Sequence, residues 1–98
     1  MTKADRFDFD PVLMSRVRLA ILSALVTTTE LEFTELKDLL GVTQGNLSVH
    51  AGKLEQARYV RIDKRFVDKK PVTRFVITKL GRDALVAHVR LLKSVLGE

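Results

Sequence analysis

The stretch LKDLLGVTQGNLSVHAGKLEQA, residues 36–57, constrains the fold more than any other part of the chain. Two helical patterns of apolar residues follow one another with only Gly41 and Val42 between them. Gly41 is expected to end the first helix in a left-handed conformation. Thr43 is expected to cap the second, with Val42 and Leu47 at the two positions of a hydrophobic staple. Two helices joined by so tight a turn predict a helix-turn-helix.

The second predicted helix, residues 43–57, has an apolar stripe and an opposite face of unusual composition. An ordinary exposed helix face is rich in Glu, Lys and Arg. Here that face carries small or neutral groups with a single lysine, which favours close approach to another large object. The stripe is Leu47, Ala51, Leu54 and Ala57, and the outward residues are Gln44, Ser48, Val49, Gly52 and Lys53, flanked by Asn46.

The net charge of +5 is concentrated in one segment. Residues 43–79 hold nine basic and three acidic side chains, a net +6, whereas the rest of the chain is at −1. A basic surface on an otherwise nearly neutral protein indicates a polyanionic partner. The alternative is a solvated basic face without a partner.

The patterns on either side of the helix-turn-helix predict two long helices and a hairpin. Asp10 and Pro11 fit the N-cap and first position of a helix over residues 11–28. Residues 31–33 fit a brief strand, and Thr34 fits the cap of the next helix. YVRIDKRF and VTRFVIT alternate with period two around a turn VDKKP, which predicts a β-hairpin. Thr78 is expected to cap a final helix over residues 79–96.

Length and composition bound the remaining possibilities. We expect one domain over residues 1–98, with residues 1–9 as a flexible N-terminal segment. The chain contains no cysteine, which excludes disulfides and thiolate metal sites. No apolar run reaches about 18 residues and the N-terminus has no signal-like core, so we expect a cytoplasmic protein. We expect neither a metal nor a cofactor, because His50 and His88 stand on different elements without carboxylates at ligand spacing.

FTELKDLLGVTQGNLSVHAGKLEQARYV together with FVDKKPVTRFVITKLGRDAL resembles the small winged-helix transcriptional regulators related to the MarR and ArsR families. The resemblance covers roughly residues 12–96 and implies an α+β fold, mainly α with a small β-hairpin: a winged helix-turn-helix with a long C-terminal helix. It implies that helix 43–57 enters the major groove of DNA and that the wing, residues 64–74, contacts the backbone or the minor groove. Similar members have leucine at position 51 and glycine at position 58, where this chain has Ala51 and Arg58.

The candidate DNA-contact residues fall into two groups, those expected to contact base edges and those expected to contact phosphates. Gln44 and Asn46 can each pair bidentately with adenine, although Asn46 could instead serve as a local cap. Gly45 leaves a backbone N–H open at a helix N-terminus. Arg16 and Arg18 fit salt bridges to Glu30, Glu32 or Glu35 as well as they fit phosphates. The expected DNA-binding set is Thr43, Gln44, Gly45, Asn46, Ser48, Val49, His50, Lys53, Lys64, Arg65, Lys69, Lys70 and Arg74.

These features favour a sequence-specific regulator of double-stranded DNA, expected to be a dimeric repressor. Each of the two terminal helices, residues 11–28 and 79–96, has two apolar seams. The core of a single chain can cover only one seam on each helix. We therefore expect the other seams to form a homodimer interface. A dimer implies a pseudo-palindromic operator, and the family resemblance leaves room for a small-molecule effector. The alternative is a winged-helix module that binds a protein and no nucleic acid. An enzyme is not expected, since no catalytic cluster or phosphate loop is present.

Overall fold

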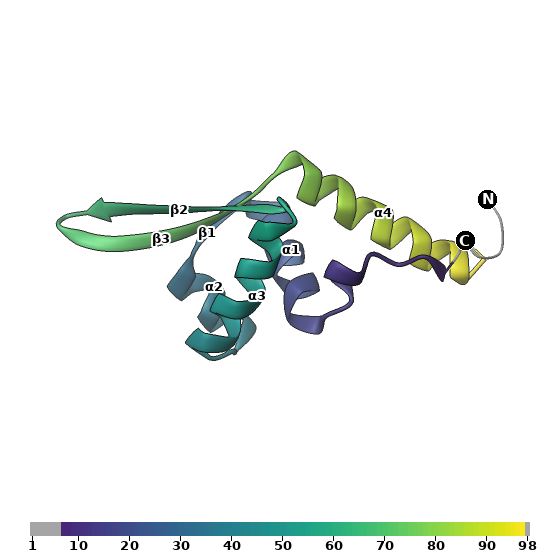
Figure 1. The fold of residues 1–98 in the computed structure, drawn as a ribbon, viewed down its shortest axis with the longest axis horizontal. Coiled ribbons are helices and arrows are strands. Elements are labelled where there is room, and N and C mark those ends of the chain that lie inside the picture. The colour runs from purple at the N-terminus through teal and green to yellow at the C-terminus, as the bar shows by residue number, and fades with distance from the viewer. Residues whose placement is uncertain (1–6, 98) are drawn as a thin grey trace.

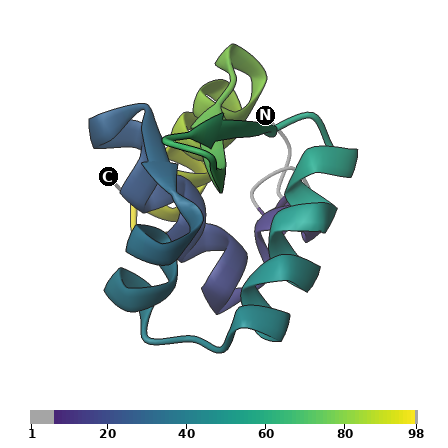
Figure 2. The same cartoon turned by 90° about the vertical axis from the view of Figure 1, so that its left-hand side faces the viewer.

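The computed structural model describes residues 7–97 and has the predicted winged-helix architecture. Figure 1 shows a hairpin projecting at one end and a long helix at the other. Seen along the hairpin in Figure 2, α1 lies between α2 and α3, beneath the sheet. The elements in order are the 3₁₀ helix η2 (Pro11–Leu13), α1 (Arg16–Thr28), β1 (Glu30–Glu32), α2 (Phe33–Leu40), α3 (Gln44–Gln56), β2 (Val60–Val67), β3 (Lys70–Ile77) and α4 (Lys79–Val95).

The three strands form an antiparallel sheet in the order β1-β3-β2. Asp68 and Lys69 join β2 to β3 with φ of 52° and 66°, so the turn has two residues in the left-handed region, as in a type I′ hairpin. The expected five-residue turn VDKKP was therefore too long: Pro71 already lies within β3, opposite Phe66. A two-residue turn keeps the hairpin narrow up to its end.

The core lies where α1, α2 and α3 meet the inner face of the sheet. Phe75 of β3 is buried there and packs against the ring of Phe33, with the ring centroids 5.6 Å apart. The predicted stripe of α3 is confirmed for Leu47, Ala51 and Leu54, which are all buried, whereas Ala57 is half-buried and forms the C-cap just after the helix. The other fully buried side chains are Leu13, Ile21, Leu22, Leu25, Leu36 and Val60.

Two helix starts differ from the prediction. Asp10 caps only η2, by accepting a hydrogen bond from the Val12 N–H at 2.9 Å. The chain then leaves the helical conformation, and Ser15 starts α1 by accepting from the Arg18 N–H at 3.2 Å. Similarly, α2 begins at Phe33 rather than after Thr34, because β1 holds the chain extended as far as Glu32.

The start of α4 is held against the end of α3 through Tyr59 and Thr78. The Thr78 hydroxyl accepts from the Gly81 N–H at 3.0 Å, which confirms the predicted cap. Gly81 lies against the Tyr59 carbonyl so closely that an added Cβ would stand 2.1 Å from that oxygen. The Tyr59 hydroxyl in turn donates a short hydrogen bond to the Asp10 carboxylate. These contacts set the direction in which α4 leaves the domain.

The terminal helices differ in how much apolar surface they leave open. The apolar residues of α1 are all buried or half-buried, so the predicted second seam of α1 is covered within the chain itself. In contrast, α4 projects beyond the other helices (Figure 1). Its Leu85 is buried, but Val89, Leu92, Val95 and Leu96 are exposed.

Candidate nucleic-acid interface

The N-terminal half of α3 presents an open polar surface. Thr43 caps the helix by accepting from the Asn46 N–H at 3.1 Å. The cap therefore uses the Thr43 hydroxyl and the Asn46 backbone, and within residues 7–97 the Asn46 amide side chain makes no hydrogen bond. Gln44, Asn46, Ser48, Val49 and Lys53 are all exposed. The structure thus leaves the predicted base contacts free to meet a ligand.

His50 occupies the boundary between the buried and outward sides of α3, where Arg18 of α1 supports it. The Arg18 guanidinium lies 2.9 Å from His50 Nδ1 and also donates to the Val12 carbonyl at 2.6 Å. Because a guanidinium can only donate, Nδ1 accepts and Nε2 carries the proton. Burial, followed by the charges of Arg18 and Lys53, lowers the pKa of His50. Within residues 7–97, Arg18 forms none of the three salt bridges considered from the sequence, and it holds the His50 ring instead.

The basic residues of the hairpin fall into two groups. Lys64, Lys69 and Lys70 are exposed and form no ion pair within the described residues. Arg65 lies 3.5 Å from Asp63, whose other neighbour is Arg61 at 3.1 Å. These arginines, Arg61 by hydrogen bonding first, lower the pKa of Asp63. The free positive charge of the wing is therefore carried mainly by its lysines.

Arg74 is placed differently from the other predicted contacts. Its guanidinium lies 3.3 Å from Glu30 and 3.5 Å from Glu32, both on β1. The strand alternation also turns it to the face of the sheet opposite Phe75. Because Arg74 is paired with two carboxylates, it carries no free positive charge for a phosphate and does not belong to the proposed contact set.

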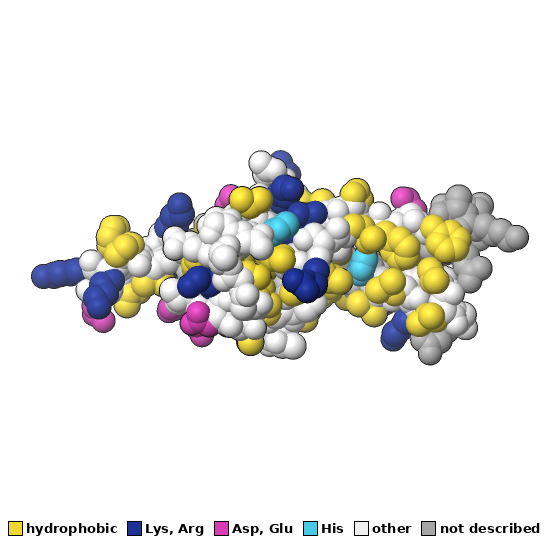
Figure 3. All heavy atoms as spheres, turned by 90° about the horizontal axis from the view of Figure 1, so that it is seen from below, with side chains coloured by type: hydrophobic (Ala, Val, Ile, Leu, Met, Phe, Trp, Pro, Cys, Tyr) yellow, Lys and Arg dark blue, Asp and Glu magenta, His cyan; other side chains and the backbone are white. Residues whose placement is uncertain are grey.

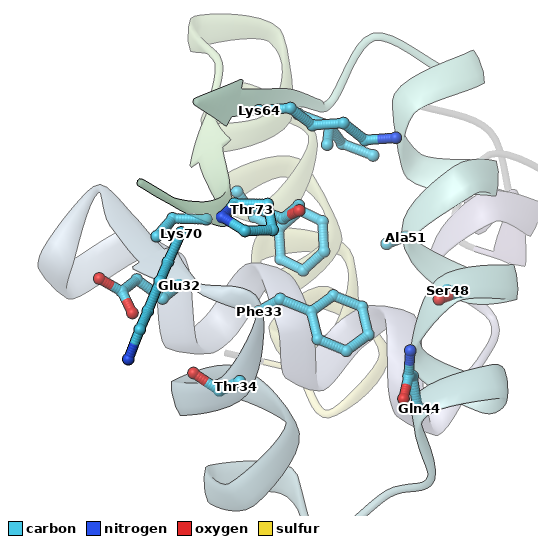
Figure 4. A pocket seen from close by; sticks show the side chains of 13 residues that line it. Glu32, Phe33, Thr34, Gln44, Ser48, Ala51, Lys64, Lys70 and Thr73 are labelled. Carbon is cyan, nitrogen blue, oxygen red and sulfur yellow. The ribbon is translucent and has the colours of Figure 1, made fainter. Parts of the chain in front are cut away.

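A groove of about 600 Å³ separates α3 from the hairpin. Figure 4 shows Gln44 and Ser48 pointing into it from α3, with Lys64 reaching from β2 toward that helix. Phe33 and Phe75 give the groove an apolar lining. Lys70 and Glu32 lie on the side away from α3 (Figure 4). The groove brings together predicted contacts from the helix and from the wing.

Two glycines on α3 are not required by the packing of the chain. Apart from the nearby backbone of α3 itself and the two chain neighbours, a Cβ at Gly45 or at Gly52 would meet no heavy atom of residues 7–97 within 4 Å. A glycine inside a helix costs about 1 kcal/mol relative to alanine. Packing within the chain does not explain why glycine is present despite this cost. An explanation therefore has to involve the outward surface of α3.

Two residues of this region escaped prediction. Arg18 of α1 contacts His50 of α3, and no local sequence pattern predicts a contact between residues 32 positions apart. Phe66 stands near the end of the hairpin with 78% of its surface exposed. Its signal was present in the alternation of RIDKRFV, where an aromatic residue shares one strand face with a lysine.

The surface divides into two regions of different character. Figure 3 shows Lys and Arg side chains on the hairpin and over the helix-turn-helix, while hydrophobic side chains gather toward α4. Among residues 7–97 no group of three His, Cys, Asp or Glu side chains could hold a metal ion. No helix in the same range has the length and apolar character to cross a membrane.

Known proteins are similar to this chain in sequence and in fold. An uncharacterized protein of Methanocaldococcus jannaschii is 35% identical over 78 residues, which is 80% of this chain and 85% of that protein. A transcriptional regulator homologue from Pyrococcus horikoshii OT3 superposes with a TM-score of 0.87 at 28% identity, covering 96% of this chain and 92% of that one. The transcriptional regulator BldR from Sulfolobus solfataricus gives a TM-score of 0.69 at 26% identity, over 84% of this chain and 58% of BldR.

These matches confirm the resemblance to regulators related to the MarR and ArsR families. The family described as "Winged helix DNA-binding domain" matches residues 17–96. The chain belongs to the winged helix DNA-binding domain family.

Proposed function

We propose that this chain acts as a homodimer on a pseudo-palindromic operator, with α3 in the major groove and the β2–β3 wing on the adjacent backbone or minor groove. By family and by its relatives it is a DNA-binding transcriptional regulator. Family and fold are those of a regulator rather than of an enzyme.

The observation that carries the docking is the open, weakly charged face of α3 beside a basic hairpin. Gln44 and Asn46 stand in the first turn, where helix-turn-helix proteins present side chains to base edges. Each amide offers a donor and an acceptor side by side, which matches adenine in the major groove. On the neighbouring β2–β3 hairpin, Lys64, Lys69 and Lys70 provide positive charges that can bind DNA phosphates.

The dimer is supported by the exposed apolar face of α4. Val89, Leu92 and Leu96 follow one another at helical spacing and are 42%, 44% and 75% exposed. Phe7 and Met14, both exposed, add apolar surface from the segment before α1. A second copy of the same helix is a self-complementary partner for such a stripe. A cytoplasmic location and a small-molecule effector remain part of the proposal.

Selection of bound duplexes from a random pool tests this function. The expected result is one enriched motif with a dyad and half-sites roughly 10 to 10.5 base pairs apart, or a small multiple of that spacing. Retention without any enriched motif would support charge-driven binding alone. No retention at low salt would contradict the proposed function and favour a protein-binding module.

A further inference from the structure

The outer half of the β2–β3 hairpin is a free two-stranded ribbon. β1 pairs only with residues 74–76 of β3, so within residues 7–97 the hairpin has no third strand from the Lys64–Thr73 pair to its tip. The Asp68–Lys69 turn closes the ribbon with two residues. Paired strands lie about 4.8 Å apart, so the tip is slender.

Near this tip the ribbon carries an apolar pair. Phe66 stands opposite Pro71, one pair in from the Val67–Lys70 pair that flanks the turn. In a hairpin with a two-residue loop the pair beside the turn exchanges hydrogen bonds and the next pair does not. The side chains of such a non-hydrogen-bonded pair lie closest together, and a proline there loses no bond to β2. Phe66 and Pro71 therefore form one apolar knob.

The knob contributes little to the fold. Phe66 is 78% exposed, the largest exposed fraction among the large hydrophobic residues described. Strand alternation puts it on the same face as Lys64 and Thr73, which line the groove beside α3. An exposed aromatic residue on a free ribbon favours aggregation, so its presence indicates contact with a partner.

The charges around the knob identify that partner as a polyanion. Four cationic side chains and two carboxylates lie within four residues of Phe66 in the sequence; Asp63 is already paired with arginines, and Asp68 is exposed in the turn, so positive charge predominates around the knob. The partner must also accept an aromatic ring between its charged edges. Duplex DNA does so at the minor groove, which is about 6 Å wide and lined by phosphates. The surrounding cations are Lys64, Arg65, Lys69 and Lys70.

We propose that Phe66, backed by Pro71, is an apolar wedge that enters the minor groove of DNA and partly unstacks one base step. This rests on the proposed function, and adds to it that the wing reads the deformability of the duplex. Apolar side chains that enter a minor groove open and kink the duplex. Pyrimidine–purine steps such as TA unstack most easily, so they are the preferred steps for such a wedge.

The test uses short duplexes that carry the fluorescent base 2-aminopurine beside a single TA step, and matched duplexes of the same composition with a stiff A-tract. Saturating wild-type chain is expected to raise the fluorescence of the TA duplex and to bind it more tightly than the A-tract duplex. Phe66→Ala should lose the rise and weaken binding to the TA duplex by about 5- to 30-fold. Val67→Ala, on the neighbouring residue of the opposite ribbon face, should behave like wild type.

The outcomes separate the wedge from the function on which it rests. No binding of wild type to any duplex at low salt would remove both. Binding without a rise in fluorescence, or identical behaviour of the two variants, would overturn the wedge and leave the DNA-binding function standing. If Phe66→Ala changed binding only to vesicles of phosphatidylserine and phosphatidylcholine, the knob would be a membrane contact and the wedge would again be wrong.

Discussion

Gly52 and Gly81 both lie inside helices, yet the space around them differs completely. Gly81 stands against the Tyr59 carbonyl, where a Cβ would come within 2.1 Å of the oxygen. Outside the nearby backbone of α3 and the two chain neighbours, Gly52 has no described heavy atom within 4 Å of the position that a Cβ would take. The first glycine is required by the joint between α3 and α4, whereas the second has no such intramolecular reason.

Gly81→Ala is expected to destabilise the chain strongly. The backbone at Tyr59 cannot yield without disturbing the Thr78 cap, so we expect a loss of at least about 2 kcal/mol in the free energy of unfolding. Urea denaturation measures it. Gly45→Ala, in open space, is the matched control, and equal stability of the two variants would show that the contact is relaxed in solution.

Gly52→Ala is expected to do the opposite. It should raise the free energy of unfolding by about 1 kcal/mol, since alanine is the better helix former. It should also weaken binding to a selected operator, because the added methyl group stands on the outward face of α3, which is proposed to enter the major groove of DNA. Urea denaturation and fluorescence anisotropy measure the two effects, with exposed Gln56→Ala as control. A stabilised variant of unchanged affinity would end the argument that Gly52 serves close approach to DNA.

At the scale of elements, the predictable parts were those with local signals. The Gly41 stop, the Thr43 and Thr78 caps and the strand alternation each occupy a few neighbouring residues, and all were confirmed. The start of α1 was not predictable in this way, because Asp10 and Ser15 are both suitable N-cap residues. Between them lies Leu13, which is buried in the core. The pairing of Arg18 with His50 depends on packing between two helices, which no local pattern encodes.

The contact between Asp10 and Tyr59, near the start of α4, can be followed separately through the titration of the tyrosine. The hydrogen bond to Asp10, together with burial, raises the pKa of Tyr59 from 10.0 to about 12. Because the folded-state pKa is the higher one, the protonated phenol stabilises the fold below about pH 10, and this contribution disappears as the pH rises toward about 12. The chain has one tyrosine, so its ultraviolet absorbance reports this group alone.

Asp10→Ala should bring the tyrosine pKa back toward 10, and it should lower the free energy of unfolding at neutral pH. Asp8→Ala, two residues away and exposed, is the control. A wild-type tyrosine that titrates near 10 would show that the bond between η2 and the base of α4 does not persist in solution.

Over the whole molecule, the two ends differ in surface character. The hairpin end carries charge and the α4 end carries apolar surface (Figure 3). Leu92→Glu is expected to convert a dimer into a monomer and to reduce operator affinity, since two linked half-sites no longer bind together. Sedimentation velocity at micromolar concentration measures the change, with Arg90→Glu on the opposite side of α4 as control. A wild-type chain that sediments as a monomer would remove the proposed interface.

We propose that α3 reads the bases whereas the wing lysines bind phosphates. The most direct measurement is affinity against salt concentration, on a selected operator and on random DNA, for two double variants. Lys69→Ala with Lys70→Ala should weaken binding to both DNAs by a similar factor and flatten the slope of log affinity against log salt by about 0.9 per lost contact. Gln44→Ala with Asn46→Ala should cost roughly 1 to 3 kcal/mol per residue on the operator, much less on random DNA, and leave the slope nearly unchanged. If the lysine variants altered base preference while the amide variants lost affinity uniformly, the wing would be the reading element and the account would be wrong.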